Sequence, residues 1–229
     1  MKVEAVIVAG GSGTRMGRPK QFLPLAGKTV LEWSLQAFLS VPEVERVIVV
    51  TRPDNVRQHA ERLGGPRVKF VESGATRMAS VRNGFKEVAE DTEVVAVHDG
   101  ARSLVTAEII RAVLEEAYDS GAAVPAVQVN DTLKKVTNKQ MWISDTPART
   151  SFWAAQTPQC YRREVLEEAL RRFPEASSAT DESQLVEKAG HKVRIVPSSP
   201  ENFKITTPAD LVMAEALLKL RQGGSRPSA

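Results

Sequence analysis

Near its start the chain reads Val8-Ala9-Gly10-Gly11-Ser12-Gly13-Thr14-Arg15-Met16-Gly17, with Pro19-Lys20-Gln21 close behind. The apolar, β-branched residues 3–9 that lead into this stretch predict a buried strand that ends at the glycines. Glycines let backbone N–H groups wrap phosphate oxygens, and Arg15 and Lys20 add two cations to the same loop. The stretch therefore predicts a strand followed by a phosphate-binding turn.

This turn matches neither of the two commonest nucleotide-binding motifs. Gly27-Lys28-Thr29 fails as a P-loop, because Phe22 stands where that motif needs its first glycine. The dinucleotide fingerprint counted from Gly11 also fails, because Arg15 and Met16 stand where its last glycine belongs. The second failure argues against a dehydrogenase.

Downstream of the turn, strand-like and helix-like segments alternate as far as residue 127. We expect strands at residues 46–51, 68–72, 93–98 and 122–127, and helices at 31–39, 55–63, 76–88 and 107–118. This alternation predicts an α/β fold: a Rossmann-like, mostly parallel sheet flanked by helices on both faces. Right-handed crossovers then place the strand C-termini, and the loops after them, along one edge of the sheet.

The alternation breaks between Val129 and about Trp153. This segment is polar, and β-type pieces at 132–136 and 141–144 flank a turn at Asn138, as in a hairpin. Because a two-stranded ribbon is marginal in water, we expect this protruding β-arm to lean on another surface.

The remainder of the chain returns to helices and one strand. Helices are expected at 163–172, 182–189 and 208–220, and a strand at 192–196. We expect one domain over residues 1–221 and a disordered tail over 222–229, which is rich in Gly, Ser and Pro.

Composition limits the classes of protein that fit. The 229 residues are 42% hydrophobic and 26% charged, which suits a globular domain with a sizeable core. A net charge of +3, spread along the chain, argues against a nucleic-acid partner. No apolar run is long enough for a membrane span, and the N-terminus does not resemble a signal peptide. We therefore expect a cytoplasmic protein with no membrane partner.

The cysteine and histidines argue against nucleophilic and metal-centred chemistry. A lone cysteine, Cys160, excludes an internal disulfide and is expected to be a buried thiol. The three histidines show no metal-ligand spacing, and His98 is expected to pack at the end of its strand.

The glycine turn resembles the signature loop of sugar nucleotidyltransferases. The chain most resembles the family of 2-C-methyl-D-erythritol 4-phosphate cytidylyltransferases, from residue 3 to about 215. Six further motifs agree in order and spacing: Gly74–Val81, Val97–Arg102, Asp131–Lys134, Gln156–Gln159, Thr180–Glu182 and Asn202–Thr206. A single motif of this kind would be weak evidence of a family, but six in the same order and spacing are specific.

The resemblance implies an enzyme of non-mevalonate isoprenoid biosynthesis that transfers CMP from CTP to 2-C-methyl-D-erythritol 4-phosphate and releases pyrophosphate. It implies the fold of the nucleotide-diphospho-sugar transferases. It also implies a homodimer in which each arm reaches across to the partner's site.

The same resemblance implies roles for particular residues. Arg15 and Lys20 would be the catalytic cations. Mg²⁺ would be bound mainly through the CTP phosphates, with its protein ligands left open. The acceptor would be bound by Thr132, Arg149 and Lys204. The nucleotide would be bound by Ala9, Gly10, Gly11, Gly74, Ser80, Asp99 and Ala101.

Chemistry agrees with this set of residues. The acceptor phosphate is already anionic near neutral pH, so its attack on the α-phosphorus needs cations and Mg²⁺ more than a His or Cys. Two other functions stay open: a cytidylyltransferase for another polyol phosphate such as ribitol 5-phosphate, and a nucleotide-binding protein without turnover. The presence of both Arg15 and Lys20 argues against the second. The residues alone do not choose CTP over UTP.

Overall fold

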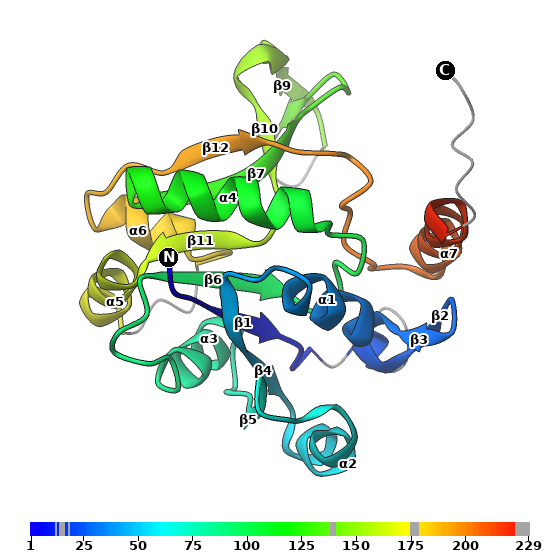
Figure 1. The fold of residues 1–229 in the computed structure, drawn as a ribbon. Helices are drawn as coiled ribbons and strands as arrows, with labels where there is room; N and C mark the ends of the chain where they lie inside the picture. Colours follow the sequence, from blue (N-terminus) through cyan, green and yellow to red (C-terminus); the bar gives the residue numbers. More distant parts are fainter. Residues whose placement is uncertain (12, 14–16, 18, 138–140, 175–178, 223–229) are drawn as a thin grey trace.

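The computed structural model describes residues 1–11, 13, 17, 19–137, 141–174 and 179–222. Across these residues the chain forms a mixed sheet with the order β10-β7-β11-β6-β1-β4-β5, and β12 pairs with β7 (Figure 1). The strands of this sheet are β1 (Val3–Val8), β4 (Val44–Thr51), β5 (Val68–Glu72), β6 (Val94–Asp99), β7 (Ala122–Gln128), β10 (Trp153–Ala155), β11 (Gln159–Arg162) and β12 (Arg194–Pro197).

Helices cover both faces of the sheet. α1 (Val30–Leu39) and α4 (Ala107–Ser120) pack on one face, where Val3, Ala5 and Ile7 of β1 point. Val6 points to the other face, which is covered by α3 (Arg77–Phe85), α5 (Arg163–Arg172) and α6 (Ser183–Lys188). Successive side chains of β1 therefore pack into two separate hydrophobic cores, as expected for a central strand that is buried on both faces.

Two further helices and a short hairpin lie at the edges. α2 (Pro53–Leu63) follows β4 and packs against β5. The hairpin of β2 (Pro24–Leu25) and β3 (Lys28–Thr29) forms a third apolar cluster with α7 (Pro208–Gln222).

Threonines start three of the main helices. Thr29 accepts a hydrogen bond from the Glu32 backbone N–H while the Glu32 carboxylate accepts one from the Thr29 N–H, a complete capping box at α1. Thr76 and Thr106 cap α3 and α4 in the same way, through their side-chain oxygens.

The mostly parallel, helix-flanked sheet confirms the predicted fold class, but two of its strands were not predicted, and neither were the two short strands of the β2–β3 hairpin. β11 runs antiparallel between the parallel strands β6 and β7, and β10 pairs antiparallel with the end of β7. These strands have three and four residues, too few to show a periodic pattern. The tail was predicted to begin at residue 222, but α7 extends through Gln222. Residues 223–229 lie outside the described residues.

The predicted arm forms a hairpin that projects beyond the ends of β7 and β10 (Figure 1). β8 (Lys135–Val136) pairs antiparallel with β9 (Ile143–Asp145), while the predicted turn at Asn138 lies outside the described residues. Most residues of this segment are polar, as expected, but most of its large apolar side chains are exposed and were not singled out from the sequence. Among the described residues, six of the twelve large hydrophobic side chains that are exposed belong to it: Val136, Met141, Trp142, Ile143, Phe152 and Trp153.

Gly84 sets the distance between α3 and the sheet. A Cβ at this position would lie 2.4 Å from Val6 Cγ1 and 2.8 Å from Val50 Cγ2. We expect Gly84→Ala to lower the free energy of unfolding by ~1–3 kcal/mol, the usual cost of overpacking. Gly65→Ala is the control, since a Cβ there would have no atom within 4 Å. Urea unfolding of the two variants measures their free energies of unfolding. Equal values for Gly84→Ala and Gly65→Ala would show that the close approach of α3 to the sheet does not depend on Gly84.

Candidate active site

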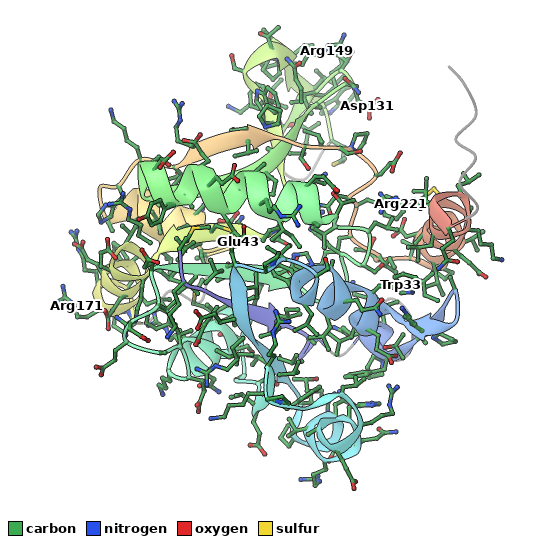
Figure 2. All side chains as sticks on the ribbon, in the orientation of Figure 1. Trp33, Glu43, Asp131, Arg149, Arg171 and Arg221 are labelled. Atoms are coloured by element: carbon green, nitrogen blue, oxygen red, sulfur yellow. The ribbon has the colours of Figure 1, made fainter. Side chains whose placement is uncertain are left out.

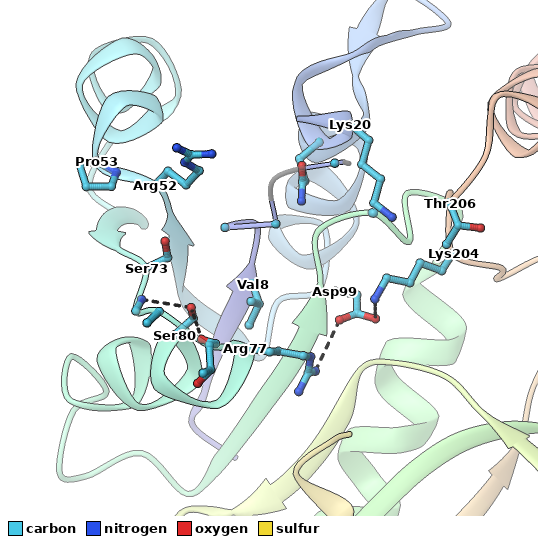
Figure 3. Close-up of a pocket in the computed structure, with 18 residues that line it drawn as sticks. Val8, Lys20, Arg52, Pro53, Ser73, Arg77, Ser80, Asp99, Lys204 and Thr206 are labelled. Atoms are coloured by element: carbon cyan, nitrogen blue, oxygen red, sulfur yellow. Dashed lines mark hydrogen bonds and ion pairs between the residues drawn. The ribbon is translucent and has the colours of Figure 1, made fainter. Parts of the chain in front are cut away.

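A cavity of about 710 Å³ opens where β1, β4, β5 and β6 end. Figure 3 shows two sides to it: Arg52, Pro53, Ser73 and Ser80 on one, and Lys20, Asp99, Lys204 and Thr206 on the other. Ligand sites of open α/β sheets lie at this edge, because the loops after parallel strands converge there. The described residues that line the cavity are Val8, Gly10, Gly11, Gly13, Lys20, Gln21, Arg52, Pro53, Ser73, Gly74, Ala75, Thr76, Arg77, Ser80, Asp99, Ala101, Lys204 and Thr206.

Glycines are required where the turn after β1 meets the loop after β5. A Cβ on Gly10 would lie 2.6 Å from Ser73 Cβ, and one on Gly74 would lie 2.4 Å from Ala79 Cβ. The Ser80 hydroxyl holds this loop, since it accepts from the Gly74 N–H at 3.1 Å and donates to the Thr76 carbonyl at 2.9 Å. A side chain at Gly10 would push the two loops apart, and one at Gly74 would push its loop away from the first turn of α3.

Lys20 reaches the cavity from a short 3₁₀ turn over Lys20–Phe22 and is itself mostly buried. The same turn contacts α2, because the Phe22 ring stacks on His59 with centroids 4.1 Å apart and planes 6° apart. Partial burial, helped by Arg62, lowers the pKa of His59, so the stacked imidazole is uncharged at neutral pH. The stack thereby joins the Lys20 side of the cavity to the helix that follows Arg52.

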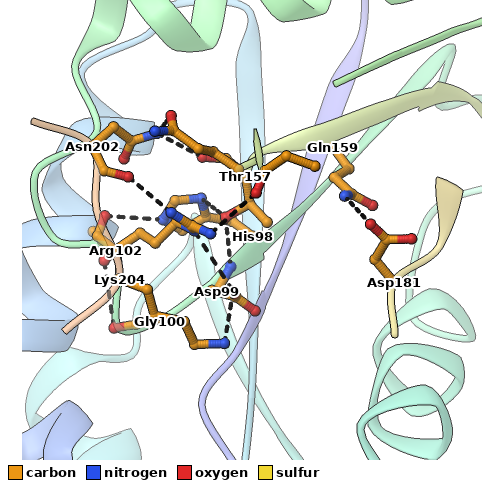
Figure 4. Close-up of polar contacts among 12 residues, drawn as sticks. His98, Asp99, Gly100, Arg102, Thr157, Gln159, Asp181, Asn202 and Lys204 are labelled. Carbon is orange, nitrogen blue, oxygen red and sulfur yellow. Dashed lines mark hydrogen bonds and ion pairs between the residues drawn. The ribbon is translucent and has the colours of Figure 1, made fainter. Parts of the chain in front are cut away.

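A single carboxylate, Asp99 at the end of β6, gathers three cations: Figure 4 shows Arg102 and Lys204 beside it, and Figure 3 shows Arg77. Asp99 Oδ2 lies 2.9 Å from Lys204 Nζ and 3.7 Å from Arg102 Nε, and Oδ1 lies 3.4 Å from an Arg77 guanidinium nitrogen. Burial by itself would raise the pKa of Asp99, but Lys204 and Arg77 outweigh it and hold this pKa well below its usual value. The carboxylate therefore stays ionised at every physiological pH.

Arg77 is shared between two carboxylates. Its guanidinium also pairs with Glu182, a fully buried residue at the start of α6. Burial would lower the pKa of Arg77, yet Glu182 and Asp99 together raise it above its usual range. Arg77 and Lys204 therefore reach the cavity already paired with carboxylates, and Lys20 is a third described cation of its lining.

His98 supports this cluster through two hydrogen bonds of its buried ring. Because the Arg102 carbonyl can only accept, the His98 Nε2–H must donate to it, at 3.3 Å. His98 Nδ1 then accepts from the Thr157 hydroxyl at 2.9 Å, and Thr157 Oγ1 accepts from the Asp99 N–H at 3.0 Å. Complete burial lowers the pKa of His98 to about 3, so the ring is neutral. The prediction that His98 packs at a strand end is confirmed.

Cys160 is also buried as predicted, and burial raises the pKa of its thiol far above neutrality. A protonated, inaccessible thiol is a poor nucleophile. Among the described residues there is no cluster of three or more His, Cys, Asp or Glu side chains able to hold a metal ion. In that same part of the chain, no helix has the length and apolar character needed to cross a membrane.

Most of the predicted site residues meet at the cavity. Ala9 lies just behind it: its N–H donates to the Val50 carbonyl at 2.7 Å, and its carbonyl accepts from the Thr51 hydroxyl at 3.0 Å. Arg15 lies outside the described residues. The predicted residues that line the cavity are Gly10, Gly11, Lys20, Gly74, Ser80, Asp99, Ala101 and Lys204.

Thr132 and Arg149 are not brought to the cavity of their own chain. Both are exposed on the arm, and Figure 2 shows Arg149 at its far end. Arg149 donates a hydrogen bond to the Asn130 carbonyl, a contact within the arm itself.

Several residues that line the cavity were not predicted from the sequence, among them Arg52, Arg77 and Thr206. Arg77 and Thr206 lie inside motifs that were recognised, but nothing in a motif says which side chain turns inward. Arg52 follows the end of β4, so its position after a buried strand was the available signal.

Asp99→Asn tests the ion-pair cluster. Because the folded-state pKa of Asp99 is depressed, its charge stabilises the fold above the ordinary value of 3.8, and this contribution is lost as pH falls below that value. We expect a loss of ~3 kcal/mol or more near pH 7, since three cations lose their shared partner. Urea unfolding should show the gap between wild type and variant shrinking below about pH 4. Asp54→Asn, an exposed partner of Arg57, should change little at any pH. A gap that stays constant down to pH 3 would contradict this account.

Comparison with known proteins gives one consistent result. The family model described as 2-C-methyl-D-erythritol 4-phosphate cytidylyltransferase matches residues 3–220. A protein of that name from Caldanaerobacter subterraneus is 43% identical over 227 residues, covering 96% of this chain and all of the relative. Another from Rubrobacter xylanophilus is 42% identical and covers 97% of both chains.

Solved structures agree with the sequence relatives. A crystal structure of 2-C-methyl-D-erythritol 4-phosphate cytidylyltransferase from Thermus thermophilus superimposes with a TM-score of 0.79 at 38% identity, covering 96% of this chain and 100% of the other. A 4-diphosphocytidyl-2C-methyl-D-erythritol synthase from Anaerococcus prevotii gives a TM-score of 0.83 at 28% identity, covering 95% and 98%. Each match extends over nearly the whole chain. The chain therefore belongs to the family of 2-C-methyl-D-erythritol 4-phosphate cytidylyltransferases.

Proposed function

We propose that the protein transfers CMP from CTP to 2-C-methyl-D-erythritol 4-phosphate, giving 4-diphosphocytidyl-2-C-methyl-D-erythritol and pyrophosphate in non-mevalonate isoprenoid biosynthesis. Family membership supports this, and the observation that carries it is the cavity itself. There a glycine turn, Lys20 and the cations around Asp99 face one space large enough for a nucleotide. Its free thiol, Cys160, and its use of CTP fit a reducing, cytoplasmic setting.

The reaction is an in-line displacement. An oxygen of the acceptor phosphate forms a bond to the α-phosphorus of CTP, and the bond from that phosphorus to the bridging oxygen of pyrophosphate breaks. No proton needs to be removed, because the acceptor phosphate is already anionic at neutral pH. The neutral His98 and the buried Cys160 are consistent with direct attack. The protein's task is to position two polyanions and offset their repulsion.

We assign the two ends of the cavity to the two substrates. The backbone of Gly10, Gly11 and Gly74, fastened by Ser80, would bind the nucleotide, and Ala9 would shape this turn from behind. Lys20 and Arg15 would compensate the charge of the departing pyrophosphate. Lys204 would bind the acceptor phosphate. It already bonds Asp99 through one N–H and, as an ammonium group, has two more to offer.

Mg²⁺ fits this site. Asp99 is the one carboxylate among the described residues lining the cavity, next to the backbone of Ala101. Mg²⁺ is commonly held by one or two carboxylates together with substrate phosphates and water, which this donor set allows. Bound there, Mg²⁺ would neutralise phosphate charge as the displacement proceeds.

Lys20→Ala tests the catalytic assignment. Loss of one preorganised cation should lower kcat by ~10²-fold or more. The assay follows pyrophosphate with CTP or UTP, Mg²⁺, and either 2-C-methyl-D-erythritol 4-phosphate or ribitol 5-phosphate. Wild type should release pyrophosphate only with CTP and the first acceptor. Lys69→Ala, a surface residue paired with Glu87, should behave as wild type. If pyrophosphate were released with ribitol 5-phosphate but not with 2-C-methyl-D-erythritol 4-phosphate, the proposed identity of the acceptor would be wrong. If Lys20→Ala kept full activity, the proposed catalytic role of Lys20 would be wrong.

We further propose that the enzyme is a homodimer whose sites are completed by the partner's arm. Thr132 and Arg149 are expected to bind the acceptor, yet in their own chain neither lines the cavity. The exposed apolar side chains of the arm give a second reason. Neighbouring exposed apolar residues such as Trp142 and Ile143 are typical of a surface that another protein chain covers. A two-fold contact between copies of the chain buries such a surface in both at once.

Complementation tests the arm. When Lys20→Ala and Arg149→Ala proteins are mixed and exchange subunits, each heterodimer should contain one site with both defects and one with neither. Random exchange would then return about a quarter of wild-type activity. If Arg149 acts within its own subunit, every site keeps one defect and mixing restores nothing. Sedimentation provides the control, because a fully active monomer would exclude this arrangement.

A further inference from the structure

Four described cations line the cavity, and Arg52 differs from the other three. Arg77 and Lys204 are paired with Asp99, and Lys20 also has a partner. Arg52 is exposed, and among the described residues its side chain makes no hydrogen bond or ion pair. Among the described cations of the cavity wall, its guanidinium is therefore the one that has all of its N–H groups open to a ligand.

The backbone that carries Arg52 is firmly held. The Thr51 hydroxyl donates to the Ala9 carbonyl at 3.0 Å, and the Thr51 carbonyl accepts from the Ser73 N–H at 2.7 Å. On the other side, the Arg52 carbonyl accepts from the Val56 N–H at 3.0 Å and begins α2, with Pro53 as the next residue. These bonds tie the ends of β1, β4 and β5 together, so the side chain of Arg52 starts from a fixed point at the rim.

Strand order places Arg52 at the nucleoside end of the site. β4, which Arg52 follows, lies between β1 and β5, on the side of Ser73 and Gly74. Asp99 ends β6, on the opposite side of β1, together with Lys204. Figure 3 shows this separation directly, with Arg52 near Ser73 and away from Asp99 and Lys204. Under the proposed function, Lys204 binds the acceptor phosphate, so the α-phosphorus that this phosphate attacks lies toward Lys204 and Asp99. The base of the same nucleotide then extends to the other end of the cavity, toward Gly74 and Ser80.

We propose that Arg52 is a nucleotide-binding residue whose planar guanidinium covers the exposed face of the cytosine ring. The inference rests on the proposed function, since it takes CTP as the ligand. A guanidinium stacks well on a flat ring, whereas an ammonium group does not present a plane. The contact is made equally in the bound substrate and in the transition state, because the base does not react. Arg52 therefore supplies affinity for the nucleotide and leaves the chemical step unchanged.

The test compares Arg52→Ala and Arg52→Lys with Arg57→Ala. Arg57 is an exposed arginine of α2, the helix that Arg52 precedes, and it pairs with Asp54 outside the cavity. Arg52→Ala should raise the KM for CTP about 5- to 10-fold, the scale of a guanidinium–ring contact. It should raise the Kd for CMP, measured by calorimetry, by the same factor. Its kcat should stay within about twofold of wild type, as expected for uniform binding. Arg52→Lys should resemble Arg52→Ala, and Arg57→Ala should resemble wild type.

Three results would overturn the proposal, each in a different way. A CTP KM and a CMP Kd that both stay at wild-type values in Arg52→Ala would show that Arg52 does not touch the nucleotide. Weaker inhibition by pyrophosphate in Arg52→Ala, with unchanged CMP binding and rescue by Arg52→Lys, would place Arg52 on the terminal phosphates. A wild-type protein that neither binds CMP nor turns over CTP would overturn the proposed function itself, which the first two results leave intact.

Discussion

Asp99 is the point on which the organisation of the site depends. Its carboxylate holds Lys204, Arg77 and Arg102, which come from three separate parts of the chain. Without this anion, three cations would repel one another in a partly buried space, where charge interactions are stronger than in bulk water. The cluster is thus assembled before any substrate arrives, and a polyanionic ligand meets cations that are already in position.

The surroundings of Asp99 explain why its position is well defined. Its backbone N–H donates to Thr157, whose hydroxyl in turn donates to His98, and His98 donates to the Arg102 carbonyl. Asn202 donates to the Thr157 carbonyl at 3.1 Å, which connects the segment before Lys204 to the same network. The Asp99 N–H, the Thr157 hydroxyl and both ring nitrogens of His98 each have a partner, whereas Asn202 Oδ1 is buried without one. Networks of satisfied hydrogen bonds such as this one favour one arrangement of side chains over others.

Local patterns predicted much of the fold, while contacts between distant segments were out of reach. The bounds of β5 and α5 were predicted to the residue, since a short apolar strand pattern and an amphipathic helical period are properties of one segment. β11 was missed because its place between β6 and β7 depends on pairing with both. At the site, the glycine turn was visible as a motif, but the pairing of Arg77 with Glu182, 105 positions later, was not. Arg52 belongs to no recognised motif and became a candidate only once the strand ends were placed together.

The way α2 is attached has a consequence for how the protein moves. None of its residues is fully buried, and besides its packing along β5 it is held by the Phe22–His59 stack and an ion pair between Arg62 and Glu32. Segments with so little buried apolar surface open at lower free energy than the rest of a domain. Amide hydrogen exchange in α2 should therefore be fast in the free protein compared with β1 or β6. A ligand that bridges Arg52 and the Lys20 turn would slow this exchange, so nucleotide affinity and the local stability of one helix are linked.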